Sequence, residues 1–227
     1  MTTEVSESEA TGKVDTLFAG IRSTLGVASV GRLFRRLAVY PWYLDLAWRN
    51  LEHNASTAYF HRMAKELEDL AAGGRLPAED FSRSMRANAV MLMAAAALRA
   101  GANGQVPKMS LLSPADKQRV QPDIPARDSA IGETDSDPIG AALDPAMGIR
   151  VAQLRQRAAM AAESLPYRME ISSTAGRQAG LTEDQLDSVR GIIETAFQNT
   201  AATLAIAGRA SLSESRTQNH LEPAPIA

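Results

Sequence analysis

The chain has no cysteine, few aromatic residues and almost no excess of either charge. Without cysteine it can form neither a disulfide nor a thiolate metal site, and cysteine nucleophiles and dithiol redox centres are excluded. A net charge of −2 over 227 residues lacks the basic excess that is typical of nucleic-acid-binding proteins. No apolar run approaches the roughly 18 residues of a membrane-spanning helix, and the polar residues 1–13 do not resemble a signal peptide. We therefore expect a cytoplasmic protein that binds neither nucleic acid nor membrane.

Alanine supplies much of the apolar content, because 40 of the 227 residues are alanine and only 5% are aromatic. Alanine is the strongest helix former and a weak strand former. The composition therefore predicts an all-α fold, a helical bundle of about seven to eight helices.

Apolar residues at helical spacing place these helices along the chain. The pattern predicts helices over 9–25, 29–40, 41–51, 54–72, 77–98, 144–165 and 182–208. Capping signals set their ends: Gly26, Gly73 and Gly208 as stops, Ser29, Asn54 and Asp144 as N-caps, Pro41 and Pro77 at first positions, and a capping box of Thr182 with Gln185. Residues 89–98 are apolar on all sides, which is typical of a central helix. Residues 167–174 form a short strand or an extended connector, and the connector is favoured.

A change in composition divides the chain. Residues 104–143 are rich in proline and show no helical or strand period, so we expect an irregular linker that wraps the surface. The linker separates an N-terminal helical repeat over 9–103 from a C-terminal helical part-repeat over 144–208, and a disordered tail over 209–227 follows. Residues 76–86 are weakly similar to residues 181–190. A degenerate repeat and shared capping requirements both explain this similarity.

Three groups of residues could bind a ligand. Seven of the eleven aromatic residues lie between Phe34 and Phe60, among them Trp48; they line an apolar pocket or supply the bundle core. Arg35 shares a helix face with two further arginines, which attract a carboxylate or form a solvated face. Asn88 directly precedes the all-apolar run. Its amide orients a carboxylate or a water, or bonds a neighbouring backbone carbonyl.

Motifs for metal or cofactor chemistry are absent from the sequence. His53 and His61 are eight residues apart without a partner at helical spacing, and His220 lies in the tail, so no metal site is expected. No nucleophile elbow, phosphate loop or dinucleotide fingerprint is present, and no cofactor is predicted. Asp45 lies between two aromatic residues. It is a base if burial raises its pKa, or a first-turn acid that the helix dipole favours.

Residues 9–52 resemble the N-terminal repeat of the group I 2-haloacid dehalogenases. The family pattern is an IRxTLGV helix followed by FRxLAxxPxYLxxAW. The matching residues are Ile21, Arg22, Thr24, Leu25, Gly26, Val27, Phe34, Arg35, Leu37, Ala38, Pro41, Tyr43, Leu44, Ala47 and Trp48. The segment RANAVML at 86–92 resembles a later family helix in which an asparagine precedes an apolar run, and Asn88 is the match. Residues 165–208 are weakly similar to the end of the second repeat.

The resemblance implies an all-helical fold of two repeats related by a pseudo-twofold axis, with the substrate pocket between them. It implies hydrolysis of 2-haloalkanoic acids to 2-hydroxy acids without a metal or an organic cofactor. An aspartate of the family activates a water that displaces the halide directly, so the configuration at C2 inverts. On this basis we expect Asn88 to hold the substrate or water, Phe34 and Trp48 to wall the pocket, and Arg35 to attract the carboxylate of a small organic acid.

The chain departs from the family pattern at the catalytic aspartate. That residue precedes the second-repeat copy of the aromatic–Arg–x–Leu–Ala passage; this sequence has one copy, and the corresponding position is Leu33. Two hypotheses follow: a divergent, shortened dehalogenase-like hydrolase, or a non-catalytic helical protein that binds a small acid. A third is another small-molecule enzyme with Asp45 or Glu52 as its base. Because one repeat is incomplete, unpaired apolar helix faces predict a homodimer.

Overall fold

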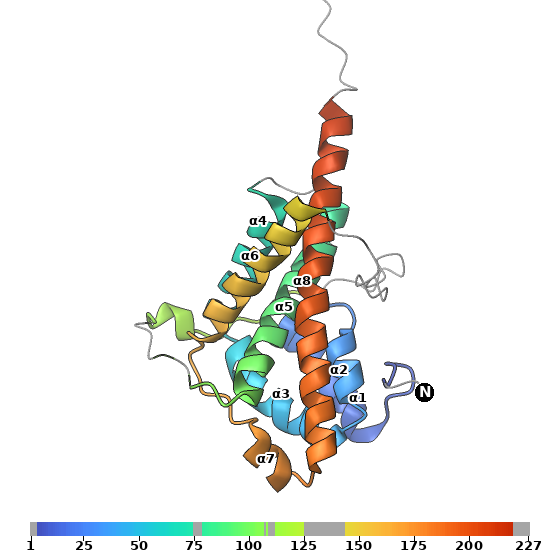
Figure 1. Ribbon diagram of the computed structural model, residues 1–227, viewed down its shortest axis with the longest axis vertical. Helices are drawn as coiled ribbons and strands as arrows, with labels where there is room; N and C mark the ends of the chain where they lie inside the picture. The colour runs from blue at the N-terminus through green and yellow to red at the C-terminus, as the bar shows by residue number, and fades with distance from the viewer. Residues whose placement is uncertain (1–3, 75–78, 107, 109–111, 125–143, 220–227) are drawn as a thin grey trace, which may run out of the picture.

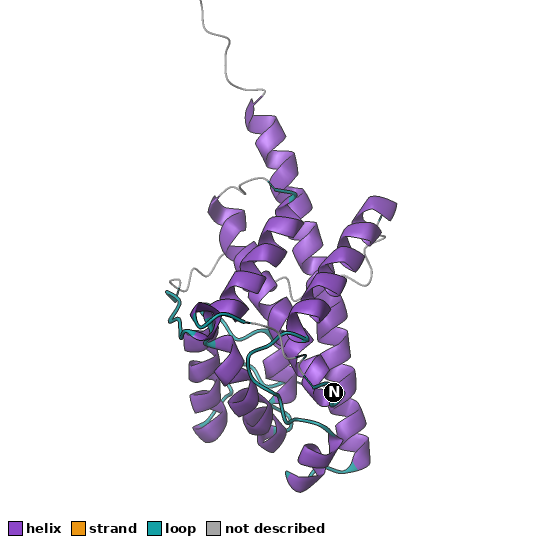
Figure 2. Cartoon of the chain, turned by 90° about the vertical axis from the view of Figure 1, so that its left-hand side faces the viewer, coloured by secondary structure: helices purple, strands orange, loops and turns teal. Residues whose placement is uncertain are grey.

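A computed structural model describes residues 4–74, 79–106, 108, 112–124 and 144–219. Within these ranges the chain forms eight α-helices and one short 3-10 helix and contains no strand (Figures 1 and 2). The helices are α1 (Gly12–Leu25), α2 (Arg32–Leu37), α3 (Pro41–Ala55), α4 (Ala58–Ala72), α5 (Glu79–Ala102), η1 (Ala115–Lys117), α6 (Pro145–Ala162), α7 (Ser173–Gln178) and α8 (Glu183–Asn219). The predicted all-α bundle is confirmed.

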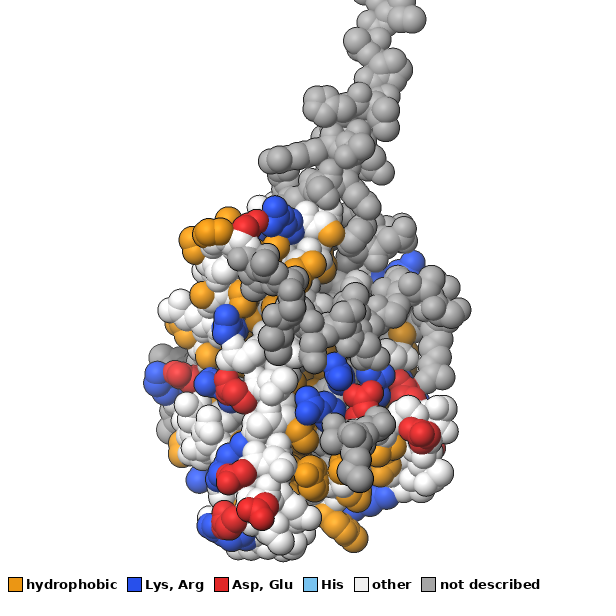
Figure 3. All heavy atoms as spheres, turned by 45° about the vertical axis from the view of Figure 1, so that its right-hand side comes forward, with side chains coloured by type: hydrophobic (Ala, Val, Ile, Leu, Met, Phe, Trp, Pro, Cys, Tyr) orange, Lys and Arg blue, Asp and Glu red, His pale blue; other side chains and the backbone are white. Residues whose placement is uncertain are grey.

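The centre of the bundle is α5, which packs along the long helix α8 (Figure 1). Every residue from 89 to 98 is buried, as the all-apolar sequence predicts. Helices α4 and α6 cover α5 and also contact α8, while α1, α2 and α3 lie around the amino-terminal half of α8. The face shown in Figure 3 carries acidic and basic side chains next to one another, in keeping with the small net charge.

Several helix ends follow the local signals in the sequence. Gly26 and Gly73 end α1 and α4 in the left-handed conformation, each with a φ of 65°. The Asp144 carboxylate accepts the Met147 N–H at 2.9 Å at the start of α6. Thr182 and Gln185 form the predicted reciprocal capping box, with N···O distances of 2.9 and 3.3 Å.

Two predicted N-caps, Ser29 and Asn54, are wrong. Helix α2 begins after Gly31 rather than Ser29, and the Val30 N–H donates at 2.6 Å to Glu7, which precedes α1. Asn54 lies in the last turn of α3 and is fully buried. Its side chain donates to the Tyr167 carbonyl and accepts the Tyr167 N–H, both at 3.0 Å.

Further differences concern the starts of α1 and α4 and the connector before α7. Thr57 caps α4 by accepting the Phe60 N–H at 3.3 Å, and α1 begins at Gly12 rather than near residue 9. The connector after Pro166 is extended without a strand and leads into α7, a helix that the sequence pattern did not predict. Pro77 lies outside the described residues.

Gly208 does not end the last helix, and this prediction is wrong. Helix α8 continues to Asn219, into the segment 209–227 for which a disordered tail was expected, and its end extends beyond the other helices (Figure 1). Gly208 is buried where α8 passes the carboxyl end of α4. A Cβ at this position would lie 2.2 Å from the carbonyl oxygen of Ala71. The glycine at position 208 therefore allows α8 to pack closely against α4, and it does not end the helix.

Part of the linker lies against the bundle, and we call its described residues 112–124 the strap. The strap is joined to the start of α4 by backbone hydrogen bonds from Ala58 N–H to Gln118 and from Val120 N–H to Ser56, both 2.8 Å long. Loop segments cross the helices on the side that Figure 2 shows. Residues 125–143 lie outside the described ranges. No described helix is long and apolar enough to cross a membrane.

The contact between Gly208 and the backbone of Ala71 predicts how substitutions in α8 change the stability of the protein. Gly208→Ala should lower the free energy of unfolding by about 1–3 kcal/mol, because the methyl group would overlap the α4 backbone. Gly191→Ala in the same helix is the matched control. It has open space around its Cβ position and should raise stability by about 0.5–1 kcal/mol. Urea unfolding followed by circular dichroism measures both, and equal stability of the two variants would contradict the packing argument.

Candidate functional site

Phe34 and Trp48, the two aromatic residues expected to wall a pocket, form a contact in the core. Phe34 is fully buried and Trp48 is 3% exposed; their rings meet edge to face with centroids 6.0 Å apart. Tyr43 is also buried, and its hydroxyl donates to the Ile171 carbonyl at 3.2 Å. Burial raises the pKa of Tyr43 to about 12, so this phenol stays protonated at neutral pH.

Arg35 lies next to Phe34 on α2 and Asn88 lies on α5, and each has a partner within the protein. An Nη2 atom of Arg35 on α2 lies 3.8 Å from the Glu4 carboxylate. The Asn88 amide on α5 donates to the Ser84 carbonyl one turn earlier, at 2.9 Å. Phe34, Trp48, Arg35 and Asn88 line none of the three pockets that described residues form at α6 and α8, beside residues 112–124 and beside α7. The role of these four residues stays a prediction.

The other candidate acids differ in their surroundings. Asp45 forms ion pairs with Lys13 at 2.8 Å and Arg49 at 2.9 Å, whereas Glu52 lines a pocket beside the strap. Burial lowers the pKa of His61, which favours its neutral form. In the part of the chain that the structure describes, no group of three histidine or acidic residues is placed to hold a metal ion.

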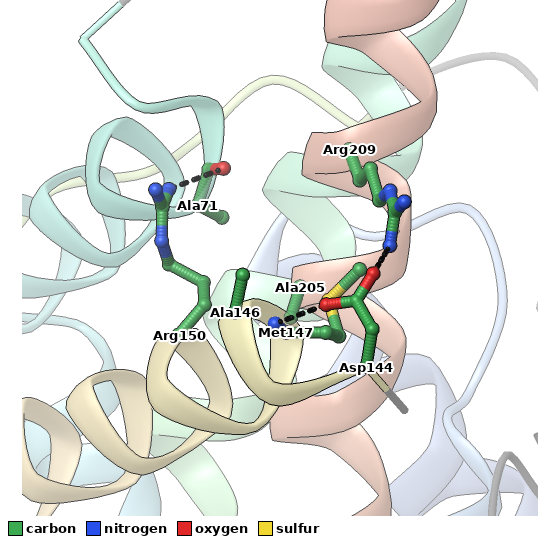
Figure 4. A pocket seen from close by; sticks show the side chains of 7 residues that line it. All are labelled: Ala71, Asp144, Ala146, Met147, Arg150, Ala205 and Arg209. Atoms are coloured by element: carbon green, nitrogen blue, oxygen red, sulfur yellow. Dashed lines mark hydrogen bonds and ion pairs between the residues drawn. The ribbon is translucent and has the colours of Figure 1, made fainter. Parts of the chain in front are cut away.

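A cavity of about 300 Å³ lies where the end of α4, the start of α6 and the second half of α8 meet (Figure 4). We call it the Asp144 pocket. Its lining residues are Ala71, Asp144, Ala146, Met147, Arg150, Ala205 and Arg209. Small apolar side chains thus form most of its wall, and one carboxylate and two guanidinium groups supply its polar surface.

Asp144 serves two partners at this pocket. One carboxylate oxygen accepts the Met147 N–H, and the other pairs with Arg209 from α8 (Figure 4). The hydrogen bond from the Met147 backbone and the bond from Arg209 hold the pKa of Asp144 below its ordinary value. Asp144 is therefore ionised at neutral pH and links the start of α6 to α8.

Arg150 lies one turn further along α6 and reaches across to α4. Its Nη1 donates to the Leu70 carbonyl at 2.6 Å. It also donates to the Ala71 carbonyl at 3.1 Å, the bond that Figure 4 shows. These carbonyls belong to the last turn of α4, where backbone acceptors lack the usual donor four residues later; the Leu70 carbonyl also accepts the Gly73 N–H at 3.3 Å. The bonds fix the position of the guanidinium group and leave its other donors for a ligand.

The pocket has the size and charge to bind a small organic anion. Its volume is at the lower end of the range of about 300–1,000 Å³ for ligand pockets. Two arginines against one aspartate give it a net positive charge, and the amino end of α6 adds a partial positive charge. Guanidinium groups bind carboxylates through paired hydrogen bonds. The arrangement suits a short monocarboxylic acid whose apolar part contacts the alanine side chains.

Asp144 is recognisable in the sequence as a helix cap, but no local pattern marks this pocket. Arg150 and Arg209 carry no local signal, because each lies on the polar side of an ordinary amphipathic helix. Asp144 and Arg209 are 65 residues apart in the sequence. Their proximity depends on how α6 packs on α8, which capping rules and periodicity do not specify.

The lowered pKa of Asp144 predicts a pH-dependent contribution to stability. The folded state binds this proton more weakly than the unfolded state, so the contribution is complete above the ordinary pKa of 3.8 and is lost as pH falls through the folded value. Asp144→Asn should lower the melting temperature at pH 6, and the difference from the native chain should shrink below pH 3.8. A difference that stays constant from pH 6 to pH 2.5 would contradict the ion pair.

Comparison with known proteins gives a structural match. No family model and no curated protein sequence matches the chain. Solved structures of a D-2-haloacid dehalogenase mutant, of D-2-haloacid dehalogenase with L-LA and of a D-2-haloacid dehalogenase mutant with D-2-CPA match with a TM-score of 0.78 at 17% identity. The matches cover 93–95% of this chain and 95–96% of the others, so the chain is not shortened relative to them. It has the fold of the 2-haloacid dehalogenases.

Proposed function

We propose that this protein is a dehalogenase-like hydrolase that cleaves the carbon–halogen bond of small 2-haloalkanoic acids by direct attack of water. The observation that carries the proposal is the match to D-2-haloacid dehalogenase structures over nearly the whole of both chains. The Asp144 pocket adds a place of suitable size and charge for such an acid. The reaction requires neither a metal nor an organic cofactor, because the halide leaves by simple displacement.

In this proposal the two arginines of the pocket hold the substrate. Arg150 and Arg209 pair with the carboxylate, and the alkyl and halogen groups lie against Ala71, Ala205 and Met147. A water molecule then forms a bond to C2 while the carbon–halogen bond breaks, and the halide leaves with the bonding electrons. The water proton passes to the Asp144 carboxylate. The product is a 2-hydroxy acid whose configuration at C2 is inverted.

The four residues chosen from the sequence define an alternative place for the same reaction. Asn88 would hold the substrate or water, Phe34 and Trp48 would form the wall, and Arg35 would attract the carboxylate. The two placements are distinguished by mutation. Asn88→Ala should leave halide release unchanged if the acid binds in the Asp144 pocket.

A second candidate function is binding of a small organic acid without turnover. The observation that favours it is that both oxygens of Asp144 already have partners, Met147 N–H and Arg209. These partners lower the pKa of the carboxylate, and a weaker base removes a proton from water less readily. This function predicts stabilisation by 2-chloropropionate without release of halide.

Halide release from D- and L-2-chloropropionate tests the enzymatic proposal. The native chain should release chloride, and Arg150→Gln and Arg209→Gln should each lower kcat/KM roughly tenfold to hundredfold, because a charge-assisted hydrogen bond contributes about 1.5–3 kcal/mol. Arg157→Gln is the matched control. It removes the same charge from α6 at a position that pairs with Glu66 outside the pocket.

The outcomes separate the two functions. No chloride release at high protein concentration, together with a rise in melting temperature on addition of 2-chloropropionate, would reject the hydrolase and support acid binding. An equal loss of activity in Arg157→Gln and Arg150→Gln would contradict the placement of the substrate.

We further propose that the protein acts in the cytoplasm as a homodimer. Large apolar side chains at the junction of α2 and α3 are exposed, with Val39 at 44% and Trp42 at 67%, and exposed apolar side chains are typical of association surfaces. Light scattering at micromolar concentration should give twice the chain mass of 24.3 kDa. Trp42→Glu should shift the mass toward that of one chain. A monomeric mass for the native chain would overturn this proposal.

A further inference from the structure

A second cavity, of about 390 Å³, lies between the carboxyl ends of α1 and α3 and the strap. We call it the strap pocket. Polar groups line it from all three sides: Ser23 and Thr24 from α1, Glu52 from α3, Ser56 just after α3, and Arg119 from the strap. It shares no lining residue with the Asp144 pocket.

The strap is fastened to the bundle on both sides of Arg119. Asp116 pairs with Arg62 of α4 at 2.6 Å before it. Gln118 and Val120, its two neighbours, form the backbone hydrogen bonds to Ala58 and Ser56. These bonds fix the strap backbone on both sides of Arg119, so the position of the Arg119 backbone beside the pocket is also fixed.

Beyond Arg119 the strap lies against the end of α1. Pro122 packs over Gly26 so closely that a Cβ on the glycine would lie 2.7 Å from the proline Cβ. The left-handed conformation and the absent side chain at Gly26 thus let the strap approach α1 and complete the cavity.

The charged groups of the strap pocket have no ionic partners in the described part of the chain. Neither Glu52 nor Arg119 forms an ion pair there, although both line the same cavity, whereas Asp45 on the same helix as Glu52 has two. The hydroxyls of Ser23 and Thr24 also make no hydrogen bond with described residues. The cavity therefore offers one negative group, one positive group and two hydroxyls to a ligand.

From this arrangement we infer that the strap pocket binds a small zwitterion, a molecule with one carboxylate and one ammonium group such as an amino acid. The carboxylate pairs with Arg119 and the ammonium group with Glu52. A simple acid would place its charge in the same cavity as the Glu52 carboxylate, and like charges at short range repel. The Asp144 pocket differs, because two arginines there face one carboxylate.

Calorimetric titration with probes of different charge separation tests the inference. Glycine, β-alanine and 4-aminobutyrate are the zwitterions, and propionate and propylammonium carry a single charge. At least one zwitterion should bind with a Kd tenfold or more below that of both single-charge probes. Glu52→Gln and Arg119→Gln should each weaken this binding about tenfold or more.

Two control variants remove the same charges outside the pocket. Asp15→Asn on α1 and Lys117→Gln on the strap change exposed residues that do not line it, and both should leave the Kd unchanged. The inference is overturned if no zwitterion binds more tightly than the single-charge probes, or if binding survives in both Glu52→Gln and Arg119→Gln. Circular dichroism confirms that each variant is folded, and halide release should not change, which separates this test from that of the proposed function.

Discussion

Burial of one apolar helix organises this molecule. Residues 89–98 of α5 present no polar side to water, so neighbouring helices must cover them on every side. Helices α4, α6 and α8 do so, and alanine lets them approach closely at little cost in side-chain entropy. The same requirement for close approach explains why Gly208 stands inside α8, against the backbone of Ala71.

This packing brings helix ends together and so creates the Asp144 pocket. Helix α4 ends, α6 begins and α8 passes at one place, and each helix end exposes backbone groups that need partners. Arg150 satisfies the carbonyls of α4 and Asp144 caps α6. Charged side chains that line the pocket therefore also stabilise the helix bundle. The surface between these charged side chains is apolar, because alanine side chains of the three helices line it.

The strap adds a cavity with a different balance of charge. It lies across the ends of α1 and α3 and brings Arg119 to the cavity that Glu52 lines. The Asp144 pocket has a net positive lining, and the strap pocket has one charge of each sign. The two cavities therefore favour different ligands on electrostatic grounds, an anion in the first and a zwitterion in the second.

The sequence by itself determined the helical class, the central position of residues 89–98 and the helix ends at Gly26, Gly73, Asp144 and Thr182. These features depend on side-chain periodicity or on bonds between residues at most four positions apart, which a sequence displays directly. The resemblance at residues 9–52 also indicated the dehalogenase fold, which the structural match at 17% identity supports.

The tertiary structure alone decided what Asn54 and Gly208 do and where the cavities lie. Asn54 bonds Tyr167, 113 residues away, and Asp144 pairs with Arg209, 65 residues away. Local signals assigned Asn54 and Gly208 to helix ends. Both assignments were wrong, because the partners of these residues belong to segments that are distant in the sequence. The linker showed no period at all, and its strap is fixed by contacts with α1 and α4. Binding sites arise from such long-range contacts, which is why the sequence predicted the fold better than the pockets.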